Sequence, residues 1–248
     1  MDGTLITSAG RMSDRTVAAL DAARAKGVKL ALATGRHTIE LGCVSGYRFD
    51  AYMTSNGQCC YDAQGVFHTQ TIERSDIEGL LSLLRREQIC CSFMEFDRMY
   101  ISAIDDSTRA SFARAHLPTP PIEDVNRALE HDVYQVTAFV NAQREQIIAR
   151  AMPGCVLKRW NPYYVDVMPR SGGKQVGMEK VLKRLGVAAR DAAAMGDGEN
   201  DIAMLELAGV GVAMGNASPE VKAAADYISA SNDAEGIEQA MRYLDLCP

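Results

Sequence analysis

The 248-residue chain has no hydrophobic run near the length of about 20 residues that a membrane-spanning helix needs. Its first residues lack the basic and apolar segments of a secretory signal peptide. Lysine and arginine (26) are outnumbered by aspartate and glutamate (32), so the net charge of −6 leaves no basic footprint for nucleic acid or an anionic membrane. We therefore expect a soluble, cytoplasmic protein with no nucleic-acid or membrane partner.

Disulfide and zinc signatures are also missing. The seven cysteines include no Cys-x-x-Cys pair, and their odd number argues against a secreted disulfide framework. The four histidines show no metal-ligand spacing. We interpret the cysteines as small hydrophobic residues in strands. Composition is that of a globular protein, with 47% hydrophobic and 23% charged residues, and the length suits one large domain or two modest ones.

The most informative stretch is an acidic turn near the C-terminal end of the chain. Residues 191–195 have the length of a buried parallel strand, and residues 202–209 are typical of a helix that ends at a glycine. Between them, three acids and an amide lie in the glycine-hinged turn 197–201, at the strand end where open α/β sheets bind ligands. Because clustered carboxylates repel one another and oxygen ligands suit a hard cation, the turn predicts a Mg²⁺ site.

Two other interpretations of this turn are weaker. A solvated acidic loop would not need the apolar strand and helix that flank it and that should be buried. A helix-loop-helix calcium site that began at Asp197 would need glycine at its sixth position, where Ile202 stands.

Strands and helices alternate at both ends of the chain, which predicts a doubly wound parallel sheet with a Rossmann-like core. The strands predicted there are 28–33, 51–54, 191–195, 210–214 and 226–229. The middle of the chain, between the second and third of these strands, instead has a pattern of short strands and helices that is typical of an α+β module. We therefore predict an α/β core formed by residues 1–71 and 170–248, with an inserted α+β cap domain at 72–169.

Several local signals are specific enough to test. Ser13 should cap a helix that ends at Gly27, and a hairpin should turn at residues 62–65. The pattern of Ser75 and Glu78 predicts a capping box, and a further helix is expected near 107–116.

Two further pieces stand where the chemistry of an α/β protein is usually found. Thr34 and Gly35 form a turn whose hydroxyl and N–H groups could hold a phosphate oxygen, although Thr34 could equally cap the next helix. Lys174 follows two glycines at a helix start, where a cation opposes the helix dipole, so an anion-binding role is favoured over a merely exposed lysine. With the acidic turn, these residues suit phosphoryl transfer.

The order of four short motifs along the chain is more specific than any one of them. Asp-Gly-Thr at 2–4, Thr-Gly-Arg at 34–36, Gly-Gly-Lys at 172–174 and Gly-Asp-Gly-Glu-Asn-Asp at 196–201 resemble the four motifs of the haloacid dehalogenase-like hydrolases. More narrowly, the chain is similar to the Cof-type phosphatases, which carry a large α/β cap between the second and third motifs. The resemblance covers nearly the whole chain. P-type ATPases have comparable acidic sites but also need membrane helices, which this sequence lacks.

The resemblance implies a Mg²⁺-dependent phosphatase that hydrolyses small phosphomonoesters, such as sugar phosphates, through a phospho-aspartate intermediate. Asp2 would act as general acid and then general base, and its carbonyl would bind Mg²⁺. Arg36 would tie the second motif to the scaffold. The remaining roles implied are phosphate binding by Thr34, Gly35, Lys174 and Asn200, metal ligation by Asp197, and orientation of the metal site by Asp201.

The chain departs from the family at one important point. The family motif is Asp-x-Asp-Gly-Thr after a hydrophobic strand, and here x is Met1, so the nucleophilic aspartate and the first strand would lie upstream of the sequence. We favour a natural protein that begins upstream of Met1; a genuine short form that binds phosphate is the other explanation. In the short form, the α-amino group of Met1 would lie near the phosphate, two strands would expose unpaired backbone groups, and catalysis would be nearly lost.

Two other functions stay open at this point. A phosphomutase of the same superfamily would transfer the phosphoryl group rather than release it, and a non-catalytic protein would only bind a phosphorylated ligand. The partner expected in each case is a small phosphorylated metabolite, and the protein is expected to be a monomer or a small homo-oligomer.

Overall fold

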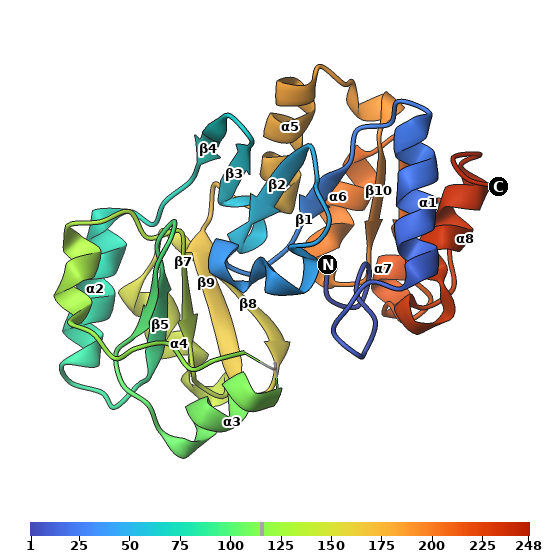
Figure 1. The fold of residues 1–248 in the computed structure, drawn as a ribbon. Helices are drawn as coiled ribbons and strands as arrows, with labels where there is room; N and C mark the ends of the chain where they lie inside the picture. The colour runs from blue at the N-terminus through green and yellow to red at the C-terminus, as the bar shows by residue number, and fades with distance from the viewer. Residues whose placement is uncertain (115–116) are drawn as a thin grey trace. The chain divides into compact units, whose positions relative to one another are not determined.

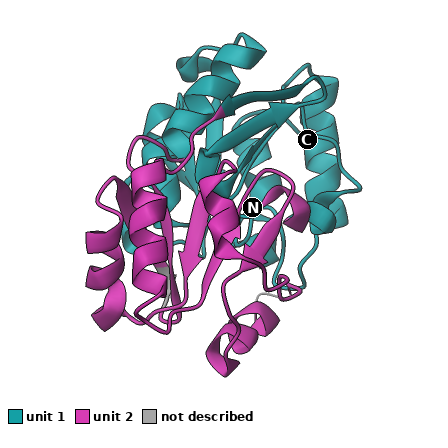
Figure 2. Ribbon diagram, turned by 90° about the vertical axis from the view of Figure 1, so that its left-hand side faces the viewer, with its two compact units in different colours: residues 1–36, 41–68, 174–248 teal, residues 37–40, 69–173 magenta. Residues whose placement is uncertain are grey.

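The computed structural model describes residues 1–114 and 117–248, which form two compact units (Figure 2). Unit 1 comprises residues 1–36, 41–68 and 174–248, and unit 2 comprises residues 37–40 and 69–173. Within these described parts of the chain, every helix is too short or too polar to cross a membrane.

Unit 1 contains two sheets in which most strands run parallel (Figure 1). The first sheet, in strand order, consists of β1 (Ala31–Ala33), β2 (Ala51–Thr54), β3 (Cys59–Asp62) and β4 (Gly65–Thr69). The second consists of β10 (Ala193–Gly196), β11 (Val210–Ala213) and β12 (Tyr227–Ile228). The predicted α/β fold with parallel strands is confirmed, and so is the hairpin of β3 and β4.

The helices of unit 1 follow the predicted alternation with the strands. They are α1 (Asp14–Ala25), α5 (Lys174–Leu185), α6 (Ile202–Leu207), α7 (Pro219–Ala223) and α8 (Gly236–Tyr243). Ser13 caps α1 as predicted, because its Oγ accepts a hydrogen bond from the Thr16 N–H at 3.0 Å. Leu20 of α1 belongs to the same buried cluster as Ile237 and Met241 of α8, so burial of apolar surface joins the first and last helices of the unit.

The two sheets of unit 1 are separated by a cavity of about 580 Å³. Strands β1 and β10, each the edge of its sheet among the described residues, both line it, together with apolar side chains that include Leu20, Met178 and Val181. A strand edge presents unpaired N–H and C=O groups. The predicted single sheet is therefore divided in two, with the cavity between the edges at β1 and β10.

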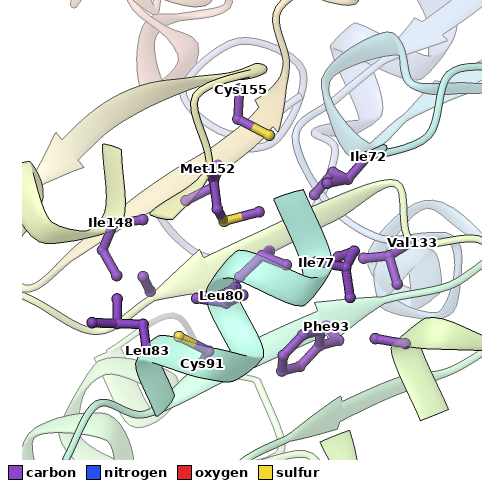
Figure 3. Close-up of a cluster of buried hydrophobic side chains, with 14 of the residues drawn as sticks. Ile72, Ile77, Leu80, Leu83, Cys91, Phe93, Val133, Ile148, Met152 and Cys155 are labelled. Carbon is purple, nitrogen blue, oxygen red and sulfur yellow. The ribbon is translucent and has the colours of Figure 1, made fainter. Parts of the chain in front are cut away.

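Unit 2 is built on one antiparallel sheet. Its strands, in spatial order, are β6 (Met99–Ile101), β5 (Cys91–Met94), β7 (Gln135–Ala138), β9 (Tyr164–Pro169) and β8 (Cys155–Asn161). Helices α2 (Arg74–Leu84) and α4 (Glu145–Ala151) pack against it through buried side chains that include Leu80, Ile148 and Phe93 (Figure 3). A third helix, α3 (Asp106–Arg114), corresponds to the one predicted near 107–116, whose last two residues lie outside the described residues.

The predicted capping box at Ser75 is wrong. Helix α2 has Glu73 at its N-cap position and no side-chain cap. The carboxylate of Asp76 instead accepts the Gly154 N–H at 3.0 Å, and Glu78 pairs with Arg74 at 3.0 Å. Contacts from another part of the chain and from the helix surface have replaced the local pattern.

Gly177 provides a test of how closely helix α5 approaches the turn after β2. A Cβ atom built on Gly177 would lie 2.8 Å from Gly57 Cα. Alanine inside a helix is normally better than glycine by about 1 kcal/mol, but overpacking against backbone costs about 1–3 kcal/mol. We expect Gly177→Ala to lower the free energy of unfolding by about 1–2 kcal/mol in urea denaturation.

Gly46→Ala is the matched control, because a Cβ atom there meets nothing within 4 Å. It should change the free energy of unfolding by less than about 0.5 kcal/mol. Equal stability of the two variants would contradict the close approach of α5.

Candidate active site

Residues 1–4 lie directly against the acidic turn that follows β10. Thr4 Oγ1 donates a hydrogen bond to Asp197 Oδ1 at 2.5 Å. Gly3 has φ +67°, and a Cβ atom built on it would lie 2.1 Å from Asp197 Oδ2, so glycine is required there for conformation and for space. The amide of Asn216 holds the Gly3 carbonyl at 2.8 Å. The structure therefore brings together the two sequence motifs that are farthest apart in the chain.

Asp201 and Lys174 form a buried ion pair at the centre of this region. Lys174 Nζ lies 2.6 Å from Asp201 Oδ1, and both side chains are at least 94% buried (5% and 6% exposed). The second oxygen, Oδ2, accepts the backbone N–H groups of Asp197 and Gly198, each at 3.1 Å. Burial alone would raise the pKa of Asp201, but Lys174, the Met1 ammonium and the backbone donors hold that pKa below its usual value. Asp201 is therefore ionised and shapes the turn.

The α-amino group of Met1 lies in the same electrostatic environment. It donates to the carbonyl of Ala33, the last residue of β1, at 3.3 Å. Burial and the charge of Lys174 lower the pKa of this amino group, while Asp201, Asp2 and Asp197 act in the opposite direction. Because Met1 also lines the cavity of unit 1, the charged site and the apolar cavity meet at this residue.

Asp2 is paired with Arg36. Two guanidinium nitrogens of Arg36 contact the Asp2 carboxylate, at 2.9 and 2.5 Å, although the Asp2 side chain is 54% exposed. Burial acts to raise the pKa of Asp2, but the hydrogen bonds and charge of Arg36 outweigh it, so the pKa is lowered. In this arrangement Asp2 is ionised, which is the state of a general base. Arg36 ties the second motif to the first through this carboxylate.

Thr34 is buried, and its hydroxyl oxygen accepts the Arg36 N–H at 3.0 Å, closing the turn of the second motif. The Thr34 carbonyl in turn accepts the N–H of Asn56 at 3.0 Å. Gly35 packs against the Asn56 side chain, and Asn200 Nδ2 donates to Asn56 Oδ1 at 2.7 Å. Asn56 thus joins Thr34, Gly35 and Asn200. The four motifs do not include Asn56, and its only signal in the sequence is the Asn56-Gly57 pair at the end of a predicted strand.

Only some of the oxygen atoms in this region are available to bind a hard cation. Among the described residues, no group of three or more His, Cys, Asp or Glu side chains is placed to hold a metal ion. Both oxygens of Asp201 are already used, so it orients the turn rather than contacting a metal directly. Burial raises the pKa of Asp197 despite the Thr4 hydrogen bond, so its negative charge is poorly compensated and a cation beside it would be stabilised. Asp197 and main-chain carbonyls such as that of Asp2 are the oxygen ligands that Mg²⁺ prefers.

Comparisons with known proteins show the family to which the chain belongs. The sequence profile of the haloacid dehalogenase-like hydrolases matches residues 1–241. YkrA of Bacillus subtilis is 30% identical over 254 residues, covering 99% of this chain and 96% of its own, and the phosphatase YwpJ of the same organism is 26% identical over 278 residues, covering 98% and 97%. Among solved structures, the subclass IIB sugar phosphatase BT4131 superimposes with a TM-score of 0.91 at 30% identity, covering 99% of this chain and 97% of its own.

The buried ion pair gives a prediction for stability. Lys174→Met would leave Asp201 charged and buried without its partner, so we expect the free energy of unfolding to fall by about 3–5 kcal/mol in guanidinium denaturation. The double variant Lys174→Met/Asp201→Asn should recover part of this loss, because both charges are removed together.

The exposed pair of Arg74 and Glu78 is the control, since its side chains are 69% and 55% exposed. Arg74→Ala should cost less than about 1 kcal/mol. If Lys174→Met were as stable as Arg74→Ala, the buried pair would not contribute to the free energy of unfolding as predicted.

Proposed function

The chain belongs to the haloacid dehalogenase-like hydrolases, and we propose that it is a Mg²⁺-dependent phosphatase of small phosphomonoesters, acting through a phospho-aspartate intermediate. The observation that carries this proposal is the meeting of Thr4, Lys174, Asp197 and Asp201 in one charged site. The similarity to the sugar phosphatase BT4131 over almost the entire chain favours sugar phosphates or related monoesters as the substrate class.

The proposed phosphate site combines the lysine cation of Lys174 with neutral donors. In the 248-residue chain the Met1 ammonium is close enough to interact electrostatically with Lys174. The hydroxyl of Thr34, the N–H of Gly35 and the amide of Asn200 would bind the remaining phosphate oxygens. Such a set would stabilise the negative charge of a phosphate group, because electrostatic interactions are stronger where water is excluded.

We assign the metal to Asp197 and the carbonyl of Asp2, with Asp201 holding the turn in place. Bound Mg²⁺ would supply Lewis-acid stabilisation of charge on the phosphoryl oxygens. The role of Thr4 is to fix one oxygen of Asp197 by its 2.5 Å hydrogen bond, which leaves the orientation of the carboxylate defined before a metal binds.

We place the nucleophile on an aspartate that would directly precede Met1, at the end of a strand filling the cavity between β1 and β10. The position of Met1 supports this, because its amino nitrogen lies at the carboxyl end of β1 and its side chain lines the cavity. A strand there would pair with both exposed edges and bring its final side chain to the charged site.

The proposed reaction has two steps. A carboxylate oxygen of the upstream aspartate attacks phosphorus, the phosphorus–oxygen bond of the ester breaks, and Asp2 donates its proton to the leaving alkoxide. A water molecule then attacks the phosphorus of the acyl phosphate and transfers a proton to Asp2. The bond between phosphorus and the aspartyl oxygen breaks, so inorganic phosphate is released and the nucleophile is restored. Because Arg36 holds the pKa of Asp2 low, protonation of Asp2 for the first step requires that this ion pair opens.

Residues 72–169, which belong to unit 2, are the proposed substrate-selecting cap. The core residues discriminate only phosphate, so recognition of the rest of the substrate is assigned to the inserted residues 72–169. Their antiparallel sheet has its own hydrophobic core, which is what an independently packed insertion needs.

Turnover of p-nitrophenyl phosphate with Mg²⁺ tests the proposed nucleophile. We expect the 248-residue chain to be nearly inactive, and a chain extended upstream by an apolar strand of about five residues ending in aspartate to be faster by on the order of 10⁶. The matched control is the same extension ending in asparagine, which restores the strand but not the nucleophile.

Equal rates for the two chain lengths would refute the assignment. Phosphate release that needs a bisphosphate activator would indicate a phosphomutase, and phosphate binding without turnover by the extended chain would indicate a binding protein. In the gene, in-frame codons for an apolar strand and aspartate upstream of Met1 are expected.

Mg²⁺ binding can be measured on the 248-residue chain without any turnover. We expect Asp197→Asn to weaken Mg²⁺ binding by at least about 10–100-fold in isothermal titration calorimetry, since it removes the charged ligand. Glu199→Gln removes an exposed acid from the same turn and should leave the affinity unchanged. Equal loss in both variants would point to general charge attraction and would contradict a defined site.

A further inference from the structure

The turn that follows β2 is conformationally unusual. Ser55, Asn56 and Gly57 have φ values of +47°, +57° and +86° in succession, and the first two residues are each 1% exposed. Left-handed backbone costs a non-glycine residue about 1–2 kcal/mol, with asparagine among the best tolerated. Such strain persists only where the surrounding structure over-determines it, and it concentrates at functional sites.

The backbone of this turn is bonded to the second motif. The N–H of Ser55 donates to the Arg36 carbonyl at 2.9 Å, and the N–H of Asn56 donates to the Thr34 carbonyl at 3.0 Å. The two bonds join successive N–H groups of the turn to the two carbonyls on either side of Gly35. The turn therefore sets the position of Thr34 and Gly35.

The side chain of Asn56 makes a second connection, to the acidic turn. Its Oδ1 accepts a hydrogen bond from Asn200 Nδ2 at 2.7 Å. A carboxamide nitrogen carries two hydrogens. Pairing one of them with Asn56 fixes the plane of the Asn200 amide and leaves its second hydrogen available for a phosphate oxygen.

The same turn also packs against the helix that begins with Lys174. A Cβ atom built on Gly177 would lie 2.8 Å from Gly57 Cα and 3.1 Å from the Gly57 carbonyl oxygen, so the helix approaches the backbone of the turn closely at this point. Gly177 is about one helical turn after Lys174. This contact therefore limits how far the start of α5, with Lys174, lies from the turn.

We propose that Asn56 is a positioning residue for phosphate binding, acting through Asn200. Its side chain holds the Asn200 amide, while its left-handed turn holds Thr34 and the start of α5 in register with that amide. Asn56 takes no part in the chemistry itself. The inference rests on the proposed function, since it assumes that Asn200 binds phosphate.

The test is titration of inorganic phosphate into the 248-residue chain with saturating Mg²⁺, for the wild type, Asn56→Gly, Asn200→Ala and the double variant. Glycine keeps the left-handed backbone, so Asn56→Gly removes the contacts of the side chain and leaves the backbone bonds of the turn in place. We expect each single variant to weaken phosphate binding by about 10–100-fold, as is usual when a supporting hydrogen bond is lost. The double variant should bind no more weakly than Asn200→Ala, because the two residues act as one unit.

Two readouts separate positioning from general damage. Asn56→Gly should keep the Mg²⁺ affinity of the wild type and lower the melting temperature by only about 2–4 °C, the effect of one lost buried hydrogen bond, whereas a collapsed site would lose the Mg²⁺ affinity as well. Asp245→Gly is the matched control, because Asp245 also has a left-handed backbone, with φ +56°, in the same unit near the C-terminus, where its carbonyl accepts from Lys26. It should leave phosphate binding unchanged.

Unchanged phosphate binding by Asn56→Gly would overturn the inference, and so would losses that add in the double variant or a parallel loss of Mg²⁺ affinity. A wild-type chain that binds no phosphate would instead refute the proposed function, so the two failures are distinguishable.

Discussion

The buried ion pair of Lys174 and Asp201 is the interaction on which the rest of the site depends. Removing two charges from water costs several kcal/mol per ion, and it is tolerated only when close pairing and further hydrogen bonds compensate. Here the 2.6 Å contact and the two backbone N–H groups received by Asp201 meet that condition. The pair therefore fixes the start of α5 to the acidic turn and leaves Asp197 as the carboxylate whose charge is least compensated.

A second constraint is the separation of β1 from β10. Parallel strands are normally buried on both faces and paired on both edges, yet these two strands border an apolar cavity. The carboxyl ends of both strands lead into site residues, Thr34 after β1 and Asp197 after β10. Any group that fills the space between the strands would therefore also approach the charged site.

Much of the architecture could be predicted from local patterns. The hairpin, the cap at Ser13 and the parallel strands were all recognisable because their signals lie within a few residues of one another. The capping box at Ser75 failed for the opposite reason. The neighbouring Asp76 contacts Gly154, 78 positions away in the sequence, and that tertiary contact competes with the local one.

The sequence by itself determined where the candidate site residues stand, because each motif follows a strand or begins a helix and strand ends converge at one edge of a sheet. It did not determine how those side chains pair. Asp2 is held by Arg36, 34 residues away, and Asn200 by Asn56, 144 residues away. Periodicity and spacing describe the conformation of a segment, whereas these pairings depend on distances between segments, which exist only once the chain has folded.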